Sequence, residues 1–174
     1  MSSTCSPCGI GGVLVGRVAD GGGAGANYTA AIVFGGWLDP GYTVNTENFN
    51  GTSWTEVGDQ NTARSEGQSS SNGTQTAALA AGSHPYASPQ SCEQWDGSNW
   101  TEVNDLNEAR SQAHGAGVSS TAAIAAGGFT NTGPNQGVVA NNESWNGTNW
   151  TEVNDLNTQR RLGGACGSST SALV

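Results

Sequence analysis

The 174-residue sequence contains no lysine, and its five arginines are outnumbered by fourteen acidic residues, which gives a net charge of −9. Such a surface repels the phosphate backbone, so nucleic acid is excluded as an expected partner. No run approaches the roughly 20 apolar residues of a membrane-spanning helix. The first residues lack the charged start and apolar core of a secretory signal. We therefore expect no membrane span and no conventional signal peptide.

Motifs for metal binding and catalysis are also missing. Cys5 and Cys8 form a CxxC, but Cys92 and Cys166 lie far apart and supply no second pair of zinc ligands. Terminal thiols, or one local disulfide, are the simpler interpretation. The two histidines share no ligand-like spacing, and no nucleophile-elbow, HExxH or phosphate-loop motif occurs. We expect no metal, no cofactor and no enzymatic activity.

What the sequence does contain is a repeated phrase. Each copy begins with a Trp, followed by Glu at +2, Val at +3, Asp at +5 and Arg at +10. The copies start at Trp54, Trp100 and Trp150, which are 46 and 50 residues apart. A period of roughly 40–50 residues is typical of stacked β units, none of which can bury its apolar face alone. A catalytic residue is needed only once, so residues that recur with this period are expected to hold the architecture together.

Most of the charged residues follow this period. Four of the five arginines share one repeat position: Arg17, Arg64, Arg110 and Arg160. Nine of the fourteen acids share three others: Glu47, Glu93 and Glu143; Glu56, Glu102 and Glu152; and Asp59, Asp105 and Asp155. We expect the planar arginine side chains to bond to repeated carboxylates within or between units. Likewise, we expect the periodic tryptophans to wedge between units.

Short apolar runs and turn signals divide each unit into four strands. A Gly- and Ser-rich segment follows each repeated Arg, and the next residues are apolar runs at 29–36, 76–83, 121–128 and 171–174. Such runs are typical of strands buried on both faces. After a loop come tight hairpin signals, which are Asn50-Gly51, Asp96-Gly97 and Asn146-Gly147. Recurrent glycine and the lack of a 3.6-residue stripe argue against helices, so we predict an all-β fold.

With these residues in view, the sequence resembles the kelch repeat family. The matching features are a glycine doublet after an apolar strand, an aromatic residue before a turn and a Trp a few residues later. They are seen in Gly35-Gly36 and Gly127-Gly128, and in Phe49, Trp95 and Trp145. The second unit departs from the pattern with Gly82-Ser83. The resemblance implies β-propeller blades, of the Asn-, Gly- and Thr-rich kind seen in marine phage virion proteins and environmental bacterial surface proteins.

On this resemblance the chain has an N-terminal segment with the CxxC and a partial last strand, three complete blades and the start of a fourth. Their expected bounds are 1–16, 17–63, 64–109, 110–159 and 160–174. Propellers typically close with four or more blades, and free strand edges pair readily. Three arrangements are open: the termini build one composite blade, copies share blades in an oligomer, or the chain is a piece of something longer. Completion of a half-blade by a neighbour's strand favours self-assembly.

The loops between the second and third strands carry the individual character of each unit. They hold four of the five prolines and several aromatic residues that do not repeat. Loops on a rigid scaffold are common recognition sites, although variable loops without a function are an equal alternative. The candidate partner-binding residues are Trp37, Asp39, Tyr42, His84, Tyr86, Phe129 and Asn131.

Together these features predict a non-enzymatic structural and interaction protein. We expect a phage virion or extracellular surface component that assembles with copies of itself or with other virion or surface proteins. Its loops would recognise a partner such as a host surface, a glycan or a neighbouring subunit. The alternative is a soluble glycan-binding or glycan-processing β-propeller, because aromatic faces stack on sugar rings. Paired carboxylates for glycoside hydrolysis are not excluded by the spacing.

Overall fold

The computed structural model describes residues 20–66, 68–69, 73–84, 90–131 and 136–174. These residues contain sixteen strands and no helix, and every strand pair is antiparallel, which confirms the predicted all-β class. Accordingly, no helix in the described ranges is long and apolar enough to cross a membrane. The expectations for Cys5, Cys8, the partial strand before Arg17, Arg17 itself and Tyr86 fall outside these residues.

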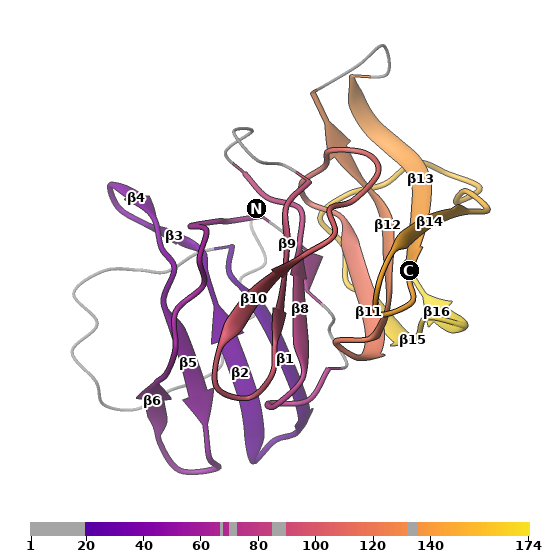
Figure 1. Ribbon diagram of the computed structural model, residues 1–174. Helices are drawn as coiled ribbons and strands as arrows, with labels where there is room; N and C mark the ends of the chain where they lie inside the picture. Colours follow the sequence, from indigo (N-terminus) through magenta and orange to yellow (C-terminus); the bar gives the residue numbers. More distant parts are fainter. Residues whose placement is uncertain (1–19, 67, 70–72, 85–89, 132–135) are drawn as a thin grey trace.

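Twelve strands form three four-stranded sheets, which stand side by side and do not close into a ring (Figure 1). Sheet I consists of β1 (Gly22–Asn27), β2 (Ala30–Phe34), β5 (Thr46–Phe49) and β6 (Trp54–Glu56). Sheet II consists of β7 (Gln68–Ser69), β8 (Ala78–Ala81), β9 (Cys92–Trp95) and β10 (Trp100–Val103). Sheet III consists of β11 (His114–Ser119), β12 (Ala122–Thr130), β13 (Gly137–Trp145) and β14 (Trp150–Val153). Two small hairpins complete the structure: β3 (Trp37–Leu38) with β4 (Gly41–Tyr42), and β15 (Cys166–Ser168) with β16 (Ser171–Leu173).

The third and fourth strands of each sheet are joined by the predicted tight hairpins. Gly51, Gly97 and Gly147 have φ values of 94°, 100° and 93°, the left-handed region that glycine tolerates best. The preceding Asn or Asp side chain accepts hydrogen bonds from the two N–H groups that follow the glycine. In the second hairpin, the N–H groups of Asn99 and Ser98 lower the pKa of the Asp96 carboxyl. The hairpin prediction is confirmed.

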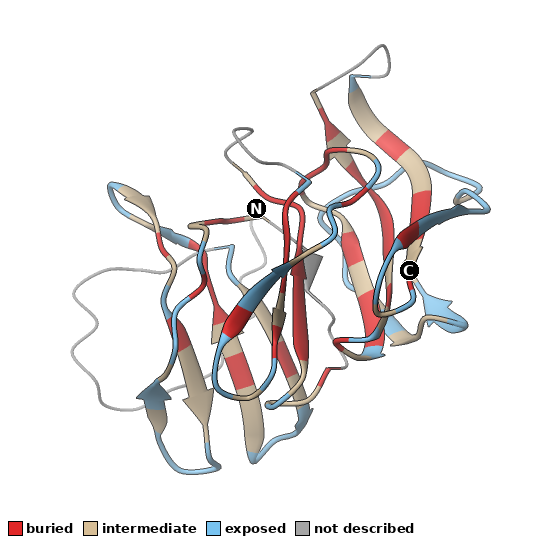
Figure 2. Cartoon of the chain, in the orientation of Figure 1, coloured by how far each residue is buried: buried red, intermediate tan, exposed pale blue. Residues whose placement is uncertain are grey.

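Strand β8 lies between two cores. Ala78 and Ala80 belong to the apolar cluster between sheets I and II, whereas Leu79 and Ala81 belong to the cluster between sheets II and III. All four are buried, as Figure 2 shows for the middle sheet. Burial on both faces is therefore confirmed for β8. The same expectation is wrong for β2, whose burial alternates because no described sheet covers its second face.

Four periodic tryptophans pack between the sheets. Trp95 and Trp100 lie in the cluster between sheets I and II, and Trp145 and Trp150 lie in the cluster between sheets II and III. The indole of Trp100 also donates a 3.0 Å hydrogen bond across the gap to the hydroxyl of a threonine in β5. Trp54, on the outer face of sheet I, is only half-buried. The periodic tryptophans of sheets II and III therefore pack between neighbouring sheets, as predicted, whereas Trp54 has no described sheet against it.

A buried ion pair joins the connection between sheets I and II to sheet II. The Nη2 of Arg64 lies 2.5 Å from Oε1 of Glu93, and its Nη1 donates to the carbonyl of Ser91 at 2.9 Å. The other carboxylate oxygen of Glu93 accepts from the backbone N–H and the side-chain amide of Asn61, at 2.7 and 2.9 Å. The carboxylate is thus bound from both sides by one short segment of the chain.

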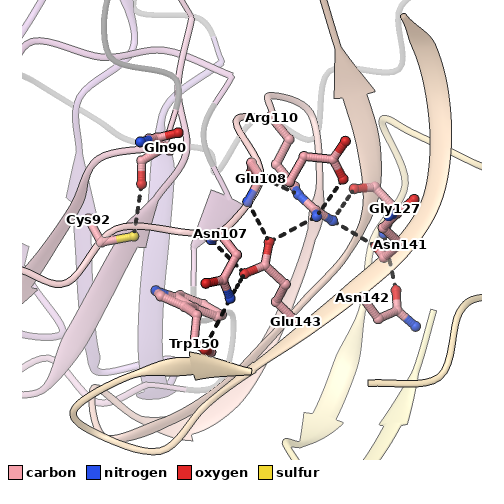
Figure 3. Close-up of polar contacts among 10 residues, drawn as sticks. All are labelled: Gln90, Cys92, Asn107, Glu108, Arg110, Gly127, Asn141, Asn142, Glu143 and Trp150. Carbon is pink, nitrogen blue, oxygen red and sulfur yellow. Dashed lines mark hydrogen bonds and ion pairs between the residues drawn. The ribbon is translucent and has the colours of Figure 1, made fainter. Parts of the chain in front are cut away.

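The same arrangement recurs one sheet further along (Figure 3). Arg110 pairs with Glu143 at 2.9 Å and donates to the carbonyl of Asn141 at 2.7 Å. Asn107 donates to Glu143 through both its backbone N–H, at 2.8 Å, and its side-chain amide, at 2.9 Å. Both arginines are almost fully buried. Of the repeated third-strand carboxylates, Glu93 and Glu143 therefore bind repeated arginines, whereas Glu47 forms no ion pair with a described residue.

The other repeated acids have a different environment. The side chains of Glu56, Glu102, Glu152, Asp59, Asp105 and Asp155 are exposed and form no ion pair within the described part of the chain. Arg160 is also exposed, and its Nη1 donates to the carbonyl of Val174 at 3.2 Å. The fourth arginine of the series, Arg17, lies outside the described residues.

The segments that connect one sheet to the next also bond through their backbone to the sheet that they leave. The carbonyl of Arg110 accepts from the N–H of Ser83 at 3.2 Å. It lies so close to Gly82 that a Cβ there would meet it at 2.5 Å, and Gly82 has a φ of 70°. The positive φ and the close carbonyl both require glycine at this position. The second unit therefore keeps the first glycine of the doublet, Gly82, although Ser83 replaces the second.

A chain of backbone hydrogen bonds links residues in the left-handed region from one unit to the next. The N–H of Glu66 donates to Asp20, that of Gln112 to Glu66 and that of Leu162 to Gln112, at 2.9, 2.6 and 3.1 Å. All four residues have φ between 52° and 58° although none is glycine. Such conformations persist only where surrounding contacts hold them, and here the contacts come from neighbouring units.

Glu143→Gln is expected to lower the free energy of unfolding by about 3 kcal/mol, because it leaves the buried guanidinium of Arg110 without a counter-charge. Urea denaturation followed by tryptophan fluorescence measures the change. The matched control is Glu152→Gln, which removes the exposed carboxylate directly opposite on β14 and should change stability by less than about 0.5 kcal/mol. Equal losses in the two variants would contradict a structural role for the buried pair.

Burial raises the pKa of the Cys92 thiol to about 12. The neutral thiol is therefore favoured in the folded state, and this stabilisation is present below the unfolded pKa of about 8.5 and lost as pH rises toward 12. At neutral pH we expect iodoacetamide to label exposed Cys166 readily, and Cys92 only after unfolding in urea. Peptide mass mapping distinguishes the two sites, and equal labelling rates in the folded protein would contradict the assignment.

Candidate functional site

The C-terminal ends of β2, β8 and β12 and the N-terminal ends of β5, β9 and β13 lie at the same end of the three sheets. The tight third-to-fourth-strand hairpins lie at the opposite end (Figure 1). We call the first end the loop edge, and its described candidate residues are Trp37, Asp39, Tyr42, His84, Phe129 and Asn131. The sheets hold these positions, and connections held by a scaffold are common recognition sites.

In sheet I the loop folds into the small β3–β4 hairpin, which pairs Trp37 with Tyr42. Their rings meet edge to face, with centroids 4.8 Å apart and planes at 75°, a favourable aromatic geometry. Trp37 keeps 36% of its surface exposed, and Asp39 is exposed at the hairpin tip, where the Asp39–Pro40 peptide bond is cis. The hairpin therefore carries a partly exposed tryptophan and an exposed aspartate.

Tyr42 connects this hairpin to sheet II. Its hydroxyl lies 2.9 Å from Nδ1 of His84, and the two rings are 5.8 Å apart. His84 is in turn fixed by paired backbone hydrogen bonds with Ser65, of 2.7 and 3.0 Å. We call Trp37, Tyr42 and His84 the aromatic cluster. The structure thus brings together three of the predicted partner-binding residues.

In sheet III, Phe129 holds the position that His84 holds in sheet II, because it pairs through its backbone with Ser111. Its ring lies under the guanidinium of Arg161, 5.1 Å from the centroid, a cation–π contact. Asn131 is half-buried, and its side-chain oxygen has no hydrogen-bond partner within the described residues. Neither residue forms a hydrogen bond or ring contact with the aromatic cluster, so the structure does not join all the described candidates into one site.

The aromatic cluster can stack on a flat apolar surface and can exchange hydrogen bonds through a phenol and an imidazole. It offers no activated nucleophile. Nor do the described residues contain a group of three or more His, Cys, Asp or Glu side chains that could hold a metal ion.

Two important residues were not predicted from the sequence. Asn61 and Asn107 each complete the binding of a buried glutamate. A signal was available, because both stand three residues before a repeated arginine. The contact between Tyr42 and His84 had no such signal, since the loops that carry them differ in length and sequence.

No family model and no curated protein matches this sequence. The residues and contacts described above therefore carry the functional argument alone.

Tyr42→Phe is expected to keep the ring contact with Trp37 but to remove the hydrogen bond to His84. The loss should shift the imidazole nitrogen resonances of His84 in NMR spectra and lower stability by no more than about 1 kcal/mol. Tyr28→Phe serves as the control, because Tyr28 is 90% exposed. Unchanged His84 resonances in Tyr42→Phe would contradict the hydrogen bond.

Proposed function

We propose that this chain is a non-enzymatic interaction module, built from kelch-like β-propeller blades, that recognises a partner through the aromatic cluster. One contrast carries the proposal. The repeated arginines and third-strand glutamates of sheets II and III bind each other between the sheets, whereas Trp37 and its neighbours at the loop edge are unique in the sequence and reach solvent. Exposed aromatic residues on a rigid scaffold are frequent binding determinants.

We place the module in a virion or on an extracellular surface, where it attaches to a larger particle or to copies of itself. The acidic, lysine-free composition supports protein or glycan partners over nucleic acid. Attachment is supported by the outer face of sheet I, where Trp54 and the apolar side chains of β2 are only half-buried. In the cores between the sheets, the corresponding residues are covered by the next sheet.

Glycan binding is the second candidate function, and the exposed ring of Trp37 favours it. Aromatic faces stack on sugar rings, and the carboxylate of Asp39 at the hairpin tip could accept hydrogen bonds from sugar hydroxyls. Glycan processing has less support, because hydrolysis needs two carboxylates about 5–10 Å apart and the β3–β4 hairpin contributes only one.

A glycan array probed with the wild-type chain, Trp37→Ala and Tyr28→Ala separates these functions. For a glycan-binding module we expect binding that Trp37→Ala lowers at least tenfold, a loss of about 1.4 kcal/mol. Tyr28→Ala should have no effect, because that exposed aromatic lies in the turn between β1 and β2 and forms no part of the cluster.

Sedimentation velocity and negative-stain images test the attachment role. Concentration-dependent association without any sugar would support a structural component. A compact monomer that binds no glycan and whose interactions are insensitive to Trp37→Ala would contradict the proposal.

A further inference from the structure

Gln60 occupies a position that is apolar in the other two units. It stands six residues after the repeated Trp, where those units have Leu106 and Leu156. The N–H of Gln60 donates to the carbonyl of Val44 at 2.9 Å. The N–H of Leu106 donates to the carbonyl of Gln90 at 3.0 Å in the same way. The sequence change therefore places an amide where the repeat otherwise places a hydrocarbon side chain.

The side chain of Gln60 is buried without a hydrogen bond. It is 4% exposed, and neither its Oε1 nor its Nε2 has a partner among the described residues. Leu106, by contrast, belongs to the apolar cluster between sheets II and III. A buried amide that loses its bonds to water and gains none in the protein is destabilising, whereas a buried leucine is stabilising. The described conformation is therefore less favourable at this point of the first unit than at the equivalent point of the second.

A second buried donor close to Gln60 also lacks a bond. A Cβ placed on Gly35 would lie 2.9 Å from Oε1 of Gln60 and 3.3 Å from Cγ of Arg64, so both side chains lie against the same glycine. The Nε of Arg64 has no partner among the described residues, whereas that of Arg110 donates to the carbonyl of Glu108 at 3.4 Å. Unpaired polar atoms of two side chains therefore lie beside Gly35.

Gly35 is the point at which the β3–β4 hairpin leaves sheet I (Figure 1). Gly35 and Gly36 lie between β2 and β3, with φ values of 62° and 115°. The N–H of Thr43 donates to the carbonyl of Gly36 at 3.0 Å, and the N–H of Gly35 donates to the carbonyl of Asn45 at 3.0 Å. These bonds close the base of the hairpin next to Gln60. Two adjacent glycines are well suited to act as a hinge, because small residues absorb changes of backbone angle most easily.

The hairpin also reaches the neighbouring sheet. The hydroxyl of Tyr42 lies 2.9 Å from Nδ1 of His84, so in the described conformation these two groups bond to each other. Movement of the hairpin about its base would release the Tyr42 hydroxyl, which could then bond to a partner. The same movement would expose the amide of Gln60 to water.

We propose that the β3–β4 hairpin opens locally about Gly35 and Gly36, and that the buried amide of Gln60 favours the open state because opening restores its hydration. The described conformation is the closed state, in which Tyr42 is bonded to His84. In the open state the Tyr42 hydroxyl is offered to a partner. Local openings of this kind involve the least stable parts of a fold.

The inference deepens the proposed function, because it concerns the regulation of the same aromatic cluster. Its bearing on recognition rests on that function, whereas the opening itself takes place without a partner. The two are therefore tested separately: binding of Trp37→Ala to a glycan array concerns recognition, and the exchange measurements below concern the opening.

The test measures hydrogen–deuterium exchange of single backbone amides by NMR, on the 174-residue chain alone. The amides of Gly35 and Gln60 report on the base of the hairpin, and those of Gly82 and Leu106 make the equivalent bonds in the second unit. We expect protection factors about tenfold lower for the first pair than for the second. Gln60→Leu should raise the protection of the first pair about tenfold, because the closed state then holds no unpaired amide, and should leave the second pair unchanged.

Gln159→Leu is the matched control, because it makes the same chemical change at an exposed side chain. Its protection factors should stay within about twofold of wild type. Circular dichroism checks the fold of each variant, and Gln60→Met, which keeps an unbranched side chain, repeats the test if Gln60→Leu misfolds.

Unchanged protection in the Gln60 variants would overturn the inference, because the amide would then be satisfied in the closed state, for example by an internal water. Equal protection of the two pairs of amides in the wild type would overturn it as well. A uniform rise at Gly82 and Leu106 would show general stabilisation of the fold in place of local opening, with the same consequence.

Discussion

The fold depends on burying one carboxylate per interface. Glu93 and Glu143 lie on third strands, where they are almost fully removed from water. An isolated buried carboxylate would cost several kcal/mol, so it is tolerated only when paired and fully hydrogen-bonded. Asparagine, arginine and backbone N–H groups of one connection supply these bonds. The requirement fixes the path of that connection, and with it the spacing between neighbouring sheets.

The close spacing in turn explains the composition of the strands. β8 has a sheet on each side, and three of its four residues are alanine. Larger side chains would keep the flanking sheets apart and break the bonds to the glutamates. The tryptophans fill the volume that alanine leaves, from the third and fourth strands rather than the second. Small and large residues are therefore divided between strands so that the polar contacts can form.

Much of this could be predicted from the sequence, because it follows from local pattern. The Asn-Gly and Asp-Gly hairpins and the structural role of the periodic tryptophans and arginines needed only spacing and residue type. The sequence pattern did not show which of the repeated carboxylates is buried. Glu93 and Glu102 repeat equally well and lie directly opposite each other, yet only Glu93 is buried, because β9 is central and β10 is an edge strand. The contact between Tyr42 and His84 depends on the path of two unlike loops, which no repeat encodes.

Arg110 and Arg160 show what such a repeat leaves undetermined. Their backbones are anchored in the same way, and the phrases around them are nearly identical. Arg110 is buried against Glu143, whereas no carboxylate of the described residues pairs with the exposed Arg160. Whether a repeated arginine is buried therefore depends on the strand beside it and not on the sequence around it.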